Sequence, residues 1–231
     1  MASSEPDLLA LLDRHTELLD RTVAGLDDLG APSLCAGWTR GHVVTHLARN
    51  AEAIGRLVRA AVDGTGDTMY ASSADRDAEI EAGAGRDLES QREDLLRTAA
   101  AVRADLGRLR PEHAGRLLER TPGVVLVASE DLPYMRLREV VIHHVDLDAG
   151  FGFADLEPEL LALLIDRKVG LLRRDDDVPD MTLRSAEGDE WSLGAGTVEV
   201  RGSRAGLLAW LTRGHTAGVT ADPLPHLQQV G

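Results

Sequence analysis

Apolar residues recur every three or four positions through residue 150, the spacing that places them on one face of an α-helix. The pattern defines four amphipathic segments, at residues 8–30, 39–64, 75–109 and 133–150. A short β-branched run, Val124, Val125 and Val127, precedes the last segment. Four helices of this kind predict a helical bundle.

Capping and breaking residues set the predicted ends of these helices. Ser4 and Thr39 are candidate N-caps of the first two segments, because a short hydroxyl side chain can accept a bond from a free backbone N–H. The third segment has a possible break at Gly83 or Gly85. Pro111 is expected to end it, since proline cannot continue the helical hydrogen-bond ladder. This segment therefore reads as one long helix with a possible interruption.

The pattern changes after Gly152, where short helical and β-like stretches alternate. Helices are predicted over 158–173 and 205–212, with strand-like pieces at 181–184 and 197–201. Such mixing within a short segment is typical of a small α+β domain. We therefore expect an α+β protein with a bundle domain at 1–152 and a small α+β domain at 153–231.

Charge and apolar run lengths exclude several classes of function. Acidic residues outnumber basic ones 39 to 25, so the formal net charge is −14. Broad contact with nucleic acid or an anionic membrane needs clustered cations and is not expected. The longest apolar run, Leu160 to Ile165, is far shorter than the roughly 20 residues of a membrane span, and the opening stretch lacks the basic region of a secretory signal. A cytoplasmic enzyme or binding protein is predicted, with a monomer as the expected state.

Metal-ligand side chains are densest on the fourth predicted helix. Glu139 and His143 are four residues apart, so both project from one face, among aliphatic neighbours. A carboxylate and an imidazole left unpaired in an apolar interior would be costly, which predicts a partner for them.

The second predicted helix supplies a candidate partner in His46, which lies four residues after His42. Together with Glu139 and His143, His46 would give three ligands and leave one position of a tetrahedral zinc open, as in catalytic sites. The alternative is that these are ordinary helix histidines paired with nearby carboxylates. No glutamate follows His42, which argues against a zinc peptidase.

Two stretches, at residues 36–47 and 138–147, resemble the mycothiol-dependent maleylpyruvate isomerases, a family of the DinB-like metalloenzymes. The resemblance implies a four-helix bundle followed by a small α+β domain. It also implies that zinc, or another divalent metal, is bound by His46, Glu139 and His143. His42 and His144 are then neighbours of the site, with His42 as the substitute ligand.

The resemblance further implies an external thiol, mycothiol, as cofactor. The chain's single cysteine, Cys35, allows no intrachain disulfide and is expected to be a small buried or loop residue. A metal lowers the pKa of a thiol that it binds, which favours an external thiolate as nucleophile. The implied reaction is addition of the thiolate to the cis double bond of maleylpyruvate, rotation, and expulsion of the thiolate to leave fumarylpyruvate.

Arg76 and Arg213 are the candidates for binding the substrate carboxylates, because a guanidinium can bind a carboxylate with two hydrogen bonds. The alternative for each is a solvated surface arginine. The family's last motif has glycine before arginine, whereas here the order is Arg213-Gly214.

Three functions are compatible with these features. The first is zinc- and mycothiol-dependent isomerisation of maleylpyruvate or a close relative. The second keeps the zinc and the thiol but transfers mycothiol to an electrophilic metabolite or xenobiotic. The third is a non-catalytic regulatory protein that responds to a metal or small molecule. In the two catalytic cases the partners are a small-molecule substrate and a thiol.

Overall fold

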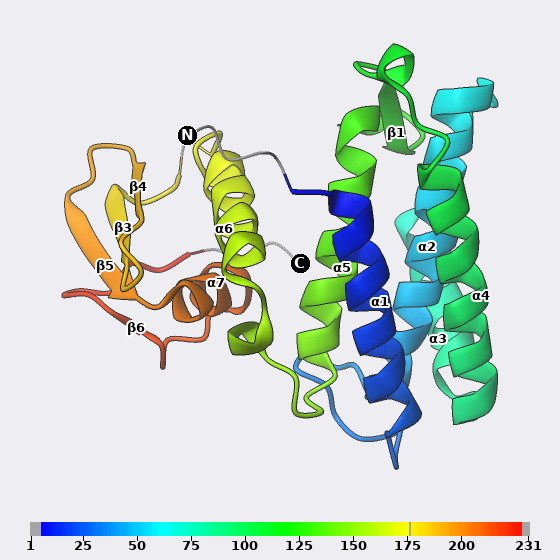
Figure 1. Cartoon of the computed structure of the whole chain (residues 1–231), viewed down its shortest axis with the longest axis horizontal. Coiled ribbons are helices and arrows are strands. Elements are labelled where there is room, and N and C mark those ends of the chain that lie inside the picture. Colours follow the sequence, from blue (N-terminus) through cyan, green and yellow to red (C-terminus); the bar gives the residue numbers. More distant parts are fainter. Residues whose placement is uncertain (1–5, 176, 228–231) are drawn as a thin grey trace. The chain divides into compact units, whose positions relative to one another are not determined.

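The computed structural model describes residues 6–175 and 177–227, and the chain divides into two compact units, Met1–Phe151 and Gly152–Gly231 (Figure 1). The described part of the first unit contains five α-helices and a β-hairpin. The helices are α1 (Leu8–Ala24), α2 (Arg40–Asp63), α3 (Ser73–Ala84), α4 (Leu88–Leu106) and α5 (Leu132–Asp146). The hairpin pairs β1 (Leu117–Thr121) with β2 (Val124–Ala128), which contains the β-branched run.

Four of these helices form the predicted bundle, with α2 at its centre. α2 packs against α4 and α5, and α1 packs against α4 and α5 (Figure 1). α3 adds a fifth helix against α2. Because α2 has neighbours on three sides, its apolar residues Leu47, Ile54 and Leu57 are completely buried. The α+β fold with an N-terminal bundle is thus confirmed.

Two glycines allow α3 to approach the first turns of α2. A Cβ on Gly83 would lie 2.5 Å from a methyl carbon of Thr45, and one on Gly41 would lie 2.3 Å from the carbonyl oxygen of Ala84. Real Cβ atoms do not come this close, so larger residues at either position would push the helices apart.

Several predicted helix ends differ from the structure. Ser4 lies outside the described residues, and Asp7 caps α1 by accepting bonds from two backbone N–H groups. α1 ends at Ala24, before the predicted residue 30. The third segment breaks at Gly85, one of the two predicted positions, but α4 ends at Leu106 rather than at Pro111, because Gly107 already closes its last turn. Thr39 caps α2 as predicted.

The second unit places two helices against a four-stranded sheet. Its elements are α6 (Pro158–Leu172), β3 (Met181–Ser185), β4 (Glu190–Leu193), β5 (Val198–Gly202), α7 (Arg204–Arg213) and β6 (Val219–Thr220). The strand order is β4-β3-β5-β6, with β3 and β5 parallel and the other pairs antiparallel. Strands β4 and β6 were not predicted. They are short, four and two residues, and so carry little alternation in the sequence.

None of the helices that the structure describes is both long enough and apolar enough to cross a bilayer.

Candidate metal centre and active site

Helices α2 and α5 bring the three candidate metal ligands together. His46 lies on α2, and Glu139 and His143 lie one turn apart on α5. The Nε2 atom of His46 lies 3.0 Å from Glu139 Oε2, and the Nε2 atom of His143 lies 3.6 Å from the same oxygen. One potential ligand atom from each residue lies within 4.8 Å of the other two. The three side chains thus converge on one point.

Burial and mutual contacts push the pKa values of these groups apart. Burial lowers the pKa of His46 to about 4, so its imidazole is neutral at pH 7. Burial alone would raise the pKa of Glu139, but hydrogen bonds with His143 and His46 hold it well below its usual value. Burial opposes charge on His143, yet hydrogen bonds with Asp146, Cys35 and Glu139 raise its pKa to about 10.

The residues at this point fit a divalent metal. Two imidazole nitrogens and one carboxylate oxygen are a donor set that zinc favours, and three protein ligands is the usual number in a catalytic zinc site. His46 is neutral and Glu139 is ionised, which are the protonation states that ligands need, whereas His143, with a pKa of about 10, must lose a proton to bind a metal. The buried Nδ1 of His46 has no hydrogen-bond partner in the part of the chain that the structure describes. This nitrogen lies on the ring edge opposite Nε2, so the fit of a metal rests on the donor set itself.

Asp146 and Cys35 lie on the other side of the His143 ring. The Nδ1 atom of His143 lies 2.8 Å from Asp146 Oδ2, and the Cys35 thiol donates to the same oxygen over 3.3 Å. Ligand atoms of Cys35, His143 and Asp146 also lie within 4.8 Å of one another. The thiol expected to be a plain loop residue is therefore part of the surroundings of His143.

An indole ring and a guanidinium lie beside the ligands. The Trp38 ring centre lies 5.3 Å from that of His46 and 6.4 Å from that of His143. The guanidinium carbon of Arg76 lies 5.9 Å from the centre of the Trp38 ring, a cation–π distance. Arg76 also contributes to lowering the pKa of His46. Arg76 is therefore close enough to act on the charge of the candidate ligands.

A cavity of about 310 Å³ is lined by Arg76 and Tyr70, together with residues of the 67–79 segment and Arg56 of α2. Burial and the charge of Glu139 raise the pKa of Tyr70, so its hydroxyl stays protonated at pH 7. The lining combines two guanidinium groups and a phenol with the carboxylates of Asp67, Asp75 and Glu79, and it includes none of the three candidate metal ligands. Arg76 also pairs with Asp77 at 2.7 Å.

The other histidines of the two motifs have different partners. His42 Nδ1 lies 2.7 Å from Thr39 Oγ1, and its Nε2 lies 3.1 Å from Glu81 Oε2. His144 Nε2 lies 2.7 Å from Thr22 Oγ1 and its ring stacks on Phe151. Neither residue belongs to a cluster of potential metal ligands among the described residues.

Arg213 lies in the second unit, at the last position of α7. Its Nη1 donates to the carbonyl oxygen of Thr212. The structure thus places Arg76 beside the candidate metal ligands and leaves the role of Arg213 as a prediction.

Comparisons with known proteins show the family of the chain. The family model for the mycothiol maleylpyruvate isomerase N-terminal domain matches residues 12–148. The chain belongs to this family. A crystal structure of the mycothiol-dependent maleylpyruvate isomerase matches it with a TM-score of 0.87 and 26% sequence identity, covering 97% of this chain and 96% of that one. A histidine-to-alanine mutant of such an isomerase matches equally well, at 25% identity. A search of curated proteins gave no match.

Sequence reasoning about this isomerase-family chain missed two residues near the ligands. Asp146 lies three positions after His143, a spacing that places both on one helix face and could have identified it. Tyr70 lies in a loop with no periodic pattern, so only the folded chain brings it near Glu139.

Proposed function

We propose that this chain is a metal-dependent cis–trans isomerase that uses mycothiol to convert maleylpyruvate, or a close relative, to the trans isomer. The observation that carries the proposal is the convergence of His46, Glu139 and His143, from two helices, in a member of this family. The solved structures that the chain resembles are named as such isomerases, which supports the same substrate class.

His46, Glu139 and His143 would hold zinc. When bound there, zinc would supply a Lewis acid that favours the thiolate form of mycothiol, the nucleophile that adds reversibly to the cis double bond. Glu139 stays ionised and His46 stays neutral, so neither loses its ligand form at pH 7. Burial of the three side chains, which expose 4 to 15% of their area, limits competition from water.

Arg76 would bind a carboxylate of the substrate and stabilise the negative charge that develops on its dicarbonyl part. Its place above Trp38 and in the cavity wall supports this role. The protonated hydroxyl of Tyr70, in the same wall, would donate a hydrogen bond to a substrate oxygen. Arg213 is proposed as a second carboxylate-binding residue from the family resemblance alone.

The test is the rate of maleylpyruvate isomerisation by zinc-loaded protein, with and without mycothiol, followed by loss of the cis substrate. Turnover that needs both zinc and thiol would support the proposal. If zinc is bound and no isomerisation occurs, the proposed substrate is wrong. A stable thiol adduct, detected by mass spectrometry, would then assign the chain to thiol transfer instead.

A further inference from the structure

The carboxylate of Asp146 is the shared acceptor for two donors next to the metal centre. Asp146 is the last residue of α5 and is completely buried. Its Oδ2 atom lies 2.8 Å from Nδ1 of His143 and accepts the Cys35 thiol over 3.3 Å. Its backbone carbonyl accepts the N–H of Leu34 over 2.9 Å, which ties the Cys35 loop to the same turn. Asp146 is therefore held in place from its backbone as well as its side chain.

This contact decides which nitrogen of His143 faces the other ligands. An imidazole with a proton on Nδ1 leaves the Nε2 lone pair free, and a carboxylate acceptor at Nδ1 favours that tautomer. The Nε2 atom of His143 is the one that lies 3.6 Å from Glu139. A carboxylate partner also makes the ligating nitrogen more basic.

We propose that Asp146 is a positioning residue of the metal centre, which fixes the ring and tautomer of His143 so that Nε2 binds the metal. The inference rests on the proposed function, because it takes His143 as a ligand. Cys35 is the second donor to Asp146 and is not itself a ligand. His143 belongs to two clusters of potential ligands. Under this assignment the cluster with His46 and Glu139 binds the metal, and the cluster with Cys35 and Asp146 supports His143.

The experiment measures zinc affinity of the metal-free full chain by competition with a chromophoric chelator, for the parent, Asp146→Asn and Asp146→Ala. Asparagine has nearly the shape of aspartate, but its amide group can donate to Nδ1 and so leave the proton on Nε2, the wrong tautomer for a ligand. We expect Asp146→Asn to lose about 10- to 100-fold in affinity, the usual effect of removing such a partner.

The two variants separate tautomer control from a purely structural role. Asp146→Ala leaves two partly buried donors without this acceptor, so it is expected to lower the melting temperature more than Asp146→Asn. It does not favour the wrong tautomer, so its loss of zinc affinity is expected to be smaller. If affinity instead follows thermal stability across the variants, the proposal is wrong. Should Asp146→Ala fail to fold, Asp146→Asn still decides it, because parent-like affinity in that variant overturns the proposal.

A matched control is Asp94→Asn, which changes another buried carboxylate of the same unit. Its expected zinc affinity equals that of the parent. A loss as large as that of Asp146→Asn would mean that any buried carboxylate of the bundle has this effect, and would overturn the proposal.

Cobalt(II) in place of zinc gives a second readout. The d–d absorption bands of the cobalt-loaded protein report its ligands, so we expect them to shift in Asp146→Asn and to stay unchanged in Cys35→Ser. A thiolate-to-cobalt charge-transfer band in the parent that Cys35→Ser removes would make Cys35 a ligand and overturn the assignment. Failure of the parent to bind zinc or cobalt would instead overturn the proposed function, and the inference with it.

Discussion

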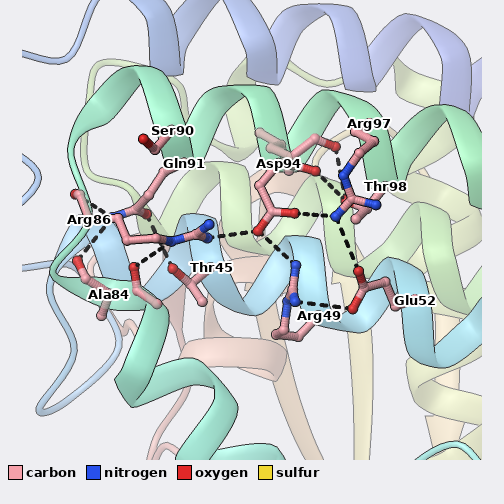
Figure 2. A network of polar contacts seen from close by, with 12 residues as sticks. Thr45, Arg49, Glu52, Ala84, Arg86, Ser90, Gln91, Asp94, Arg97 and Thr98 are labelled. Carbon is pink, nitrogen blue, oxygen red and sulfur yellow. Dashed lines mark hydrogen bonds and ion pairs between the residues drawn. The ribbon is translucent and has the colours of Figure 1, made fainter.

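Asp94 and Glu139 are both carboxylates that contact α2 from a neighbouring helix, but the charges around them are of different kinds. Asp94 of α4 bonds the guanidinium groups of Arg49, Arg86 and Arg97, at 2.6 to 2.7 Å (Figure 2). Glu139 of α5 contacts two imidazoles through Oε2, those of His46 and His143, and one guanidinium, that of Arg138, through Oε1 at 2.8 Å.

The two environments also act differently on the groups within them. Burial alone would raise the pKa of Asp94, but bonds to its arginines lower it, so its carboxylate stays charged and paired. Around Glu139 the pKa values of two chemically identical imidazoles separate, to about 4 for His46 and about 10 for His143. The first cluster ties α2 to α4 and has no proton to exchange at neutral pH. In the second, burial and hydrogen bonds drive the pKa values of two imidazoles in opposite directions, which is typical of functional sites.

The largest expected effect is the loss of zinc and turnover when a ligand is removed. His46→Ala and Glu139→Ala each leave two of the three proposed ligands, so zinc affinity is expected to fall by more than the ~100-fold effect of losing an outer partner. Isomerisation at limiting zinc should fall with it. Zinc content after dialysis and steady-state turnover would measure both effects.

His42→Ala is the matched control for His46→Ala, because it removes a histidine one turn earlier on the same helix. His42 contacts Thr39 and Glu81, so its loss should weaken the start of α2 and leave zinc content unchanged. Full zinc occupancy in His46→Ala and Glu139→Ala would contradict the metal site. Loss of zinc in His42→Ala would reassign the ligand.

Arg76→Gln tests the proposed contact with substrate. Removing a hydrogen bond to a charged group costs about 1.5 to 3 kcal/mol, so kcat/KM for isomerisation should fall by about 10- to 150-fold. Zinc affinity should not fall, because Arg76 is not in the ligand set. Arg59→Gln is the control, since Arg59 pairs with Asp105 away from the cavity wall of Arg76. Equal kcat/KM in Arg76→Gln and the parent would remove Arg76 from the mechanism.

Local sequence patterns predicted the bundle and the ligand set but not the surroundings of the ligands. Glu139 and His143 are four residues apart on one helix, so their shared face can be predicted without knowing the fold. The contacts of Cys35 and Tyr70 depend on loops that the bundle brings to α5, and loop positions carry no periodic signal. The break between α3 and α4 at Gly85 was predicted only as a possibility, because it spans few residues in a continuously charged segment.

Zinc affinity is expected to depend on pH through one histidine. In the metal-free chain the pKa of His143 is about 10, so zinc must displace its Nε2 proton at neutral pH, whereas His46, with a pKa of about 4, is already neutral. Affinity should therefore rise about tenfold per pH unit between pH 5 and pH 9, with one proton released per zinc. Chelator competition at several pH values would measure the slope. A flat profile would mean that His143 is not a ligand.

Asp94→Asn is expected to have the smallest effect on zinc binding. It should lower the free energy of unfolding and leave zinc affinity unchanged. The variant keeps the size of the side chain but loses the negative charge that faces Arg49, Arg86 and Arg97 (Figure 2). Hydrogen bonds between charged groups contribute about 1.5 to 3 kcal/mol each, and because Arg86 and Arg97 are partly exposed we expect a loss of about 1 to 3 kcal/mol in total. Urea unfolding of the metal-free protein would measure it.

The charge of Asp94 stabilises the fold above the pKa of an unfolded aspartate, so the difference in unfolding free energy between Asp94→Asn and the parent should shrink as the pH falls and the parent carboxylate becomes protonated. A difference that persists in acid would show that the asparagine acts through packing and not through the lost charge.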